Sequence, residues 1–158
     1  MKTIVVGFDG SDAAERALRR AADIADAFSA GLVVVSVTGY APAPVSTLES
    51  LPELAPPPVG GPVAPAGTVP TSAQVDPEEL ARRQLERARV SLTSRKVETE
   101  YVAQQGDPAE RLLDVAEERG ADLIVVGSRE RGFLERLLGR SVGEAVARRS
   151  ERDVLLVH

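Results

Sequence analysis

Apolar stretches alternate with segments of helical periodicity along the chain. Four predicted strands show no alternation of polar residues, which is typical of parallel strands covered by helices on both faces; they span residues 3–8, 32–37, 122–127 and 153–157. A fifth strand, 97–103, alternates apolar and polar residues. Apolar residues at helical spacing predict four helices, which begin near residues 12, 77, 108 and 141. This order predicts an α/β fold: an open doubly wound sheet of five parallel strands flanked by four helices.

Capping residues mark the expected ends of these helices. Ser11 or Asp12 can cap the first helix, and we expect Gly31 to end it. Asp76 and Asp107 each stand before a proline, which suits the first position of a helix because its missing N–H has no partner there anyway. The second and third helices are therefore predicted to begin at these two sites.

The segment 39–75 has a different composition from the rest of the chain. It holds nine of the eleven prolines and almost no charge, so it suits neither a helix nor a central strand. A loop of this length within one compact domain is either disordered or functional, for example as a cover for a site. We predict a single domain over residues 1–158, with a disordered Pro/Ala-rich loop at 39–75.

Composition and charge exclude several classes of function. The formal net charge is -5, which argues against a general nucleic-acid binder. The chain has no Cys, and His158 is its single histidine, so a thiolate nucleophile, a zinc–thiolate site and a His-based triad are excluded. No apolar run reaches the roughly 20 residues that span a bilayer. The sequence thus predicts a cytoplasmic protein with no membrane partner.

Two places at strand ends carry residues suited to binding an anion or a ribose. Asp9 directly follows the first strand, where the ligand crevice of a doubly wound sheet lies. Gly127 and Ser128 end the fourth strand, and Ser141 opens a helix whose N-terminus carries partial positive charge. The same residues also serve as ordinary strand ends and helix caps, so both interpretations stay open.

Three stretches of the chain resemble the universal stress protein family. They are IVVGFDGSDAAERAL, GDPAERLLDVAEERGADLIVVGSR and SVGEAVARRSERDVLLVH, and the likeness covers nearly the whole chain. The resemblance implies a fold like that of the adenine nucleotide alpha hydrolases. The family has a branch that binds adenosine nucleotides and a branch that does not. Binders share the pattern of Gly, two residues, Gly, nine residues, then Gly followed by Ser or Thr.

This chain departs from that pattern at two positions. Gly127 is the first glycine and Ser141 the closing serine, but Glu130 and Arg140 stand where the second and third glycines belong. Glycine at such places lets the backbone approach a phosphate closely. Glu130 adds a negative charge beside a polyanion, whereas Arg140 either blocks the amide cradle or pairs with phosphate through its guanidinium.

The resemblance implies a set of nucleotide contacts and a dimer interface. The nucleotide-binding residues are expected to be Asp9, Val37, Val126, Gly127, Ser128, Arg140, Ser141 and Val142. ATP or AMP is the implied ligand, with Mg²⁺ whose protein ligands are unknown. The last strand is implied to pair with a second copy, which would place Val154 and Leu156 near a homodimer interface.

Three functions follow from these observations. The first is a regulatory homodimer in the stress response that binds adenine nucleotide and is not an enzyme. The alternative is a dimeric module that acts through protein partners without nucleotide, because Glu130 and Arg140 alter the phosphate loop. The third is a slow ATP hydrolase, for which Asp9 is the one well-placed carboxylate and no general base can be named.

Overall fold

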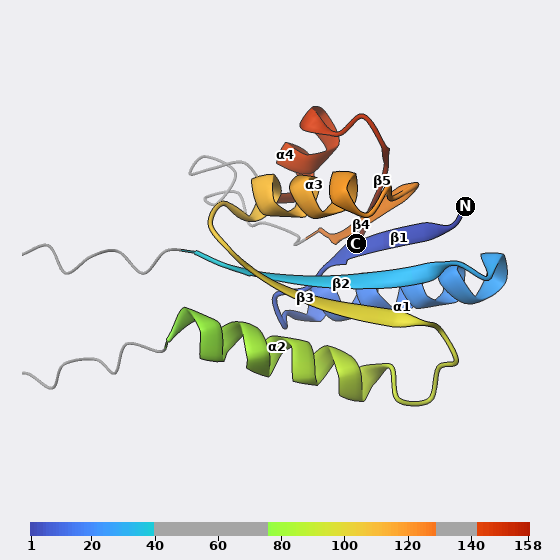
Figure 1. Cartoon of the computed structure of the whole chain (residues 1–158), viewed down its shortest axis with the longest axis horizontal. Helices are drawn as coiled ribbons and strands as arrows, with labels where there is room; N and C mark the ends of the chain where they lie inside the picture. Colours follow the sequence, from blue (N-terminus) through green and yellow to red (C-terminus); the bar gives the residue numbers. More distant parts are fainter. Residues whose placement is uncertain (40–75, 129–141) are drawn as a thin grey trace, which may run out of the picture.

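The computed structural model describes residues 1–39, 76–128 and 142–158 (Figure 1). The predictions made for the loop at 39–75, apart from its first residue, lie outside this part of the chain. So do the three phosphate-loop positions Glu130, Arg140 and Ser141.

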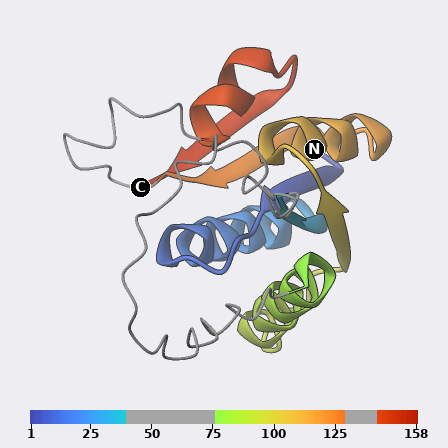
Figure 2. The same cartoon turned by 90° about the vertical axis from the view of Figure 1, so that its left-hand side faces the viewer.

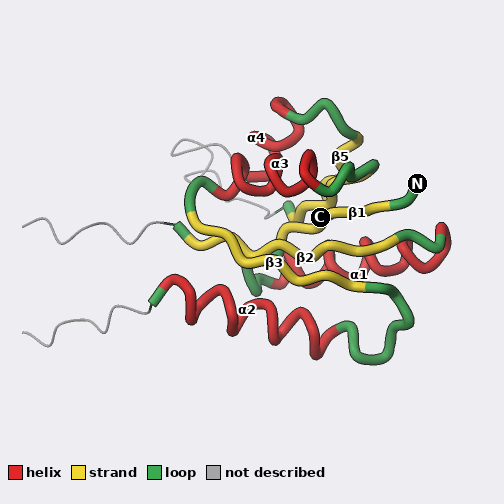
Figure 3. Tube along the Cα trace, viewed as in Figure 1, coloured by secondary structure: helices red, strands yellow, loops and turns green. Residues whose placement is uncertain are grey.

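The described residues form one parallel sheet with a helix after each of its first four strands (Figure 3). In chain order the elements are β1 (Thr3–Gly7), α1 (Asp12–Phe28), β2 (Gly31–Thr38), α2 (Pro77–Ser91), β3 (Thr99–Gln105), α3 (Pro108–Glu118), β4 (Leu123–Gly127), α4 (Val142–Arg149) and β5 (Asp153–Val157). The strand order is β3-β2-β1-β4-β5, and every neighbouring pair is parallel. The predicted α/β fold with five parallel strands and four helices is confirmed.

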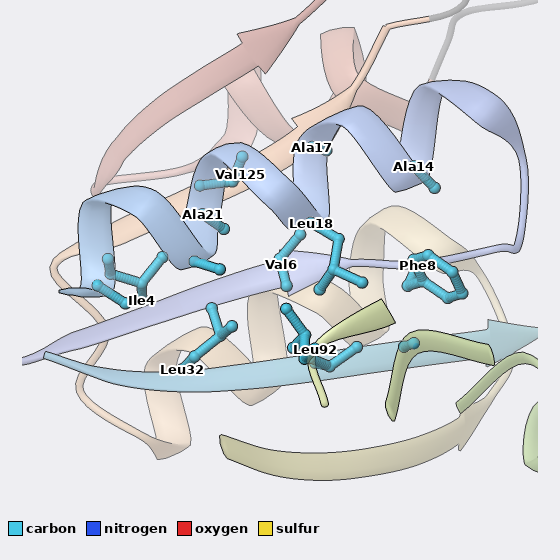
Figure 4. Close-up of a cluster of buried hydrophobic side chains, with 14 of the residues drawn as sticks. Ile4, Val6, Phe8, Ala14, Ala17, Leu18, Ala21, Leu32, Leu92 and Val125 are labelled. Atoms are coloured by element: carbon cyan, nitrogen blue, oxygen red, sulfur yellow. The ribbon is translucent and has the colours of Figure 1, made fainter. Parts of the chain in front are cut away.

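Two helices cover each face of the sheet. Helices α1 and α2 lie on one face and α3 and α4 on the other, as Figure 2 shows in a view turned by 90°. Both core clusters are built mainly from Val, Leu, Ile and Ala, and one of them also contains Phe8. Along α1 the buried positions are almost all alanines, and these small side chains let the helix lie close to the strands (Figure 4).

The central strands are buried on both faces because helices cover both. Val5 and Val6 of β1 have no exposed surface, and neither do Ile124 and Val125 of β4. Neighbouring residues along such a strand therefore belong to opposite core clusters. This explains why the sequence shows continuous apolar runs and not alternation.

The end of α1 differs from the prediction. We expected Gly31 to end the helix, but α1 ends at Phe28, and Ser29 takes the left-handed conformation with φ 51°. Its N–H and that of Ala30 bond back to carbonyls of the last turn. Gly31 instead begins β2 and donates to the carbonyl of Lys2 at 2.9 Å. Gly31 must be extended to pair with β1, so the helix ends before it, at Phe28.

The other caps follow the predictions closely. Ser11 and not Asp12 caps α1, since its hydroxyl accepts from the N–H of Ala14 at 3.2 Å. Asp76 and Asp107 cap α2 and α3 through their carboxylates, each with proline at the start of the helix. The fifth predicted strand begins two residues later than expected, at Thr99, and continues to Gln105. None of the helices among the described residues is long and apolar enough to cross a membrane.

Candidate functional site

A cavity of about 250 Å³ lies at the carboxyl ends of β1, β2 and β4. The chain leaves β1 for β2 on one side, whereas β4 lies on the other side of β1. The strand order therefore reverses at β1 and β4, and connections leave in opposite directions there. In open α/β sheets this reversal point is where ligands bind.

The walls of the cavity are mainly apolar. Val35 and Val37 of β2 form one side, and Val126 of β4 forms the other. Helix α3 contributes Leu112 and its first residue, Pro108. Such walls suit a flat apolar group better than a charged one, and the polar contacts come from the turn after β1.

That turn is built by Asp9, Gly10 and Ser11. Asp9 is exposed, and its carboxylate accepts from the N–H of Ser11 at 2.9 Å. Gly10 has φ +75°, a conformation that favours glycine. Ser11 then caps α1. Of the residues considered as caps, Ser11 alone caps α1 in the structure, and the same turn places Asp9 and Ser11 in the cavity lining.

Gly127 has a packing role that the sequence did not reveal. A Cβ on this residue would lie 2.4 Å from the carbonyl oxygen of Ala13 and 2.8 Å from the amide nitrogen of Ala14. Only glycine lets the first turn of α1 come so close to the end of β4. As a result the positive end of the α1 dipole lies beside the cavity. A contact more than a hundred residues apart in sequence leaves no local signal.

The predicted nucleotide-binding residues that the structure describes fall into two groups. Asp9, Val37, Val126, Gly127 and Val142 all line the cavity, so the fold brings together residues from four separate segments. Ser128 does not line it, and its N–H donates to the carbonyl of Val157 at 2.7 Å. That amide extends the pairing of β4 with β5.

Several lining residues were not predicted. The cavity is completed by Gly7, Phe8, Ser11, Ala14, Val35, Pro108 and Leu112. In the sequence, Leu112 is simply part of the apolar stripe of a helix, and Pro108 is a helix-starting residue. Their place at the cavity follows from how α3 lies over the sheet, which no local pattern encodes.

Acidic groups in the described residues do not gather into a metal centre. No group of three or more His, Asp or Glu side chains comes together within residues 1–39, 76–128 and 142–158. Among the described residues, Asp9 alone brings a carboxylate into the cavity lining. One carboxylate supplies at most two of the oxygen ligands that a divalent ion takes, so an ion here would need further ligands.

Comparison with known proteins places this architecture in a family. A model of the "Universal stress protein family" matches residues 1–158. A universal stress protein of Mycobacterium tuberculosis (strain H37Rv) is 36% identical over 165 residues, covering 99% of this chain and 96% of that protein. The crystal structure of a universal stress protein in complex with cAMP has a TM-score of 0.69 at 30% identity, covering 99% and 97% of the two chains. The universal stress protein from Archaeoglobus fulgidus in complex with dAMP shares the fold, with a TM-score of 0.62 at 24% identity and coverage of 100% and 98%. This chain belongs to the universal stress protein family.

Proposed function

We propose that this protein binds an adenine nucleotide and acts as a regulatory protein through binding. The observation that carries the proposal is the apolar cavity at the point where the strand order reverses, with Asp9 at its rim. The universal stress protein that is 30% identical and was solved with cAMP supports it, because this chain covers 97% of that structure.

The cavity suits the nucleoside part of the ligand. Val37 and Val126 would contact the faces of the base, and the Asp9 carboxylate would accept hydrogen bonds from ribose hydroxyls or from the adenine amino group. Ligand pockets usually measure roughly 300–1,000 Å³, so a cavity of about 250 Å³ holds a base and part of a ribose. The phosphates of ATP or AMP, with any Mg²⁺, would extend towards the segment after Gly127, where Arg140 and Ser141 follow in the sequence.

Calorimetric titration of the nucleotide-stripped protein tests the proposal directly. We expect saturable binding of ATP, AMP or cAMP in the micromolar range, about -8 kcal/mol. Asp9→Asn keeps an oxygen that can accept from the N–H of Ser11 but removes the charge, so it should weaken binding about tenfold. Asp107→Asn, which alters a helix cap outside the cavity lining, is the matched control. No heat and no shift in melting temperature with any of these ligands would contradict the proposal.

An assay of phosphate release distinguishes a protein that only binds ATP from one that hydrolyses it. The proposed role requires no phosphate release from ATP and magnesium above a control without protein. Release that is lost in Asp9→Asn would instead favour the slow hydrolase, since Asp9 brings the one carboxylate to the cavity lining among the described residues.

Two observations favour an alternative in which the protein acts as a dimer without nucleotide. Glu130 and Arg140 replace the glycines of the binding pattern, and β5 is an edge strand of the sheet. An edge strand offers unpaired backbone groups to a second copy. In this view Val154 and Leu156 would lie near the interface. Sedimentation analysis should then show a dimer whose stability is unaffected by ATP, and Val154→Asp should shift it to monomer.

A further inference from the structure

One side chain of α2 connects the interior of the sheet to the turn that carries Asp9. Gln84 receives a hydrogen bond from the hydroxyl of Ser36, a fully buried residue of β2. Its amide nitrogen donates to the main-chain carbonyl of Asp9 at 3.0 Å. That carbonyl can only accept, and the hydroxyl of Ser36 satisfies the other end of the amide, so the orientation of the Gln84 side chain is determined.

A second residue of α2 lies beside the same turn. Arg87 lies one turn further along the helix and donates to the carboxylate of Glu15 at 3.2 Å. Its Nη1 atom lies 3.0 Å from where a Cβ on Gly10 would stand, and the Cγ atom of Gln84 lies 3.7 Å from that point. Both side chains thus lie close to Gly10, whose φ of +75° is the conformation that favours glycine there.

The position of the turn matters because it forms part of the cavity. Asp9 and Ser11 line the cavity, whereas Gln84 and Arg87 do not. Gln84 therefore contacts no ligand in that cavity. It acts on the cavity through the peptide of Asp9, by holding the main chain from which the carboxylate projects.

We propose that Gln84 is a positioning residue for the ligand cavity: its bridge between Ser36 and the Asp9 carbonyl holds the Asp9 turn in the conformation that receives the nucleoside. This inference rests on the proposed function for its consequence in binding, but the clamp itself can be tested without ligand. Gln84 and Arg87 both lie within α2, all of whose residues the structure describes.

The test compares the same substitution, glutamine to methionine, at two different positions. Gln84→Met keeps the length of the side chain and its neutral charge but loses both hydrogen bonds. Gln105→Met changes an exposed glutamine at the end of β3 and serves as the matched control. Ser36→Ala removes one of the two bonds and leaves the donation to Asp9, so its effect should be intermediate.

Two readouts are taken on each variant. Without ligand, amide hydrogen exchange should accelerate at Gly10 and Ser11 in Gln84→Met and stay unchanged within β1 and β4. A merely structural role would raise exchange across the sheet as well. With ligand, the affinity for the nucleotide that the wild type binds should fall about tenfold, the consequence of losing one or two hydrogen bonds.

Faster hydrogen exchange confined to the Asp9 turn, together with weaker nucleotide binding, supports the proposal. Unchanged exchange at Gly10 and Ser11 overturns the clamp, and unchanged affinity with a loosened turn overturns its role in positioning. If the wild type binds no adenine nucleotide, the proposed function fails, and the exchange readout alone then decides whether Gln84 holds the turn.

Discussion

The two ends of the sheet differ in how closely the connections between neighbouring strands approach one another. At the amino ends of the strands, main-chain groups are tied by side chains: the Asp122 carboxylate accepts from the N–H groups of Lys2 and Thr3, and Arg152 donates to the carbonyl of Ala121. At the carboxyl ends, the chain connections diverge and leave a cavity of about 250 Å³ with apolar walls.

The difference follows from the topology. At the amino ends, the segments that lead into neighbouring strands lie close enough together to form hydrogen bonds with one another. At the carboxyl end the chain order reverses between β1 and β4, so the connections after these strands move apart. One end of the sheet is thus joined by hydrogen bonds, and the other end contains the cavity.

Two acidic groups at the amino ends of the strands have lowered pKa values. The N–H groups of Lys2 and then Thr3 lower the pKa of the Asp122 carboxyl below the usual value of an aspartate. A hydrogen bond from Arg119 lowers the pKa of Glu100, which lies near the start of β3. Both groups lie at the amino ends of their strands, where carboxylates act as acceptors for fixed partners.

The largest expected effect comes from adding a side chain at Gly127, where the first turn of α1 lies against the end of β4. In Gly127→Ala the new methyl group would stand 2.4 Å from the carbonyl oxygen of Ala13, so the first turn of α1 must move. We expect a loss of about 2–3 kcal/mol in the free energy of unfolding, as for other overpacked sites. Urea denaturation measures it.

The control for that change is Gly39→Ala, because a Cβ there meets nothing within 4 Å. Its free energy of unfolding should stay within about 0.5 kcal/mol of the wild type. Equal stability of Gly127→Ala and Gly39→Ala would mean that the close approach of α1 to β4 is not needed, and the contrast between the two sheet ends would lose its main support.

A smaller effect is expected from restoring the glycines of the phosphate loop. In the proposed binding mode, the double variant Glu130→Gly and Arg140→Gly would remove a negative charge that repels the phosphates and would let the backbone approach them. We expect ATP to bind more tightly by about 1.4 kcal/mol, a factor of ten. Titration of the double variant beside the wild type measures this. Unchanged affinity would show that the two side chains do not weaken phosphate binding.

The smallest effect concerns the amino end and depends on pH. The folded state lowers the pKa of Asp122, so its carboxylate stabilises the fold above the unfolded pKa, and this contribution is lost as pH falls through the folded pKa. In Asp122→Ala, the decline of melting temperature on acidification below about pH 4 should be shallower. Nucleotide affinity should not change, because Asp122 lies at the opposite end of the sheet from the cavity. Weaker nucleotide binding in this variant would show that the two ends are coupled.

Much of the fold could be predicted from local patterns. Continuous apolar runs predicted the central strands because β1 and β4 are covered on both faces, and Asp76 and Asp107 before proline marked two helix starts correctly. The end of α1 could not be predicted from Gly31, since Ser29 adopts the left-handed conformation there. The hydrogen bond from the Gly31 N–H to the Lys2 carbonyl decided that point, and it joins the start of β2 to the residue before β1.

The sequence by itself determined the class of fold, the order of its elements and the family, because these depend on local periodicity, caps and motifs that neighbouring residues carry. It also pointed to Asp9, Val37, Val126, Gly127 and Val142, which line one cavity. Only the tertiary structure showed the strand order, the close contact of Gly127 with Ala13, and the bridge from Ser36 through Gln84 to Asp9. These features join residues that are far apart in the chain, and such contacts arise only when the helices pack onto the sheet.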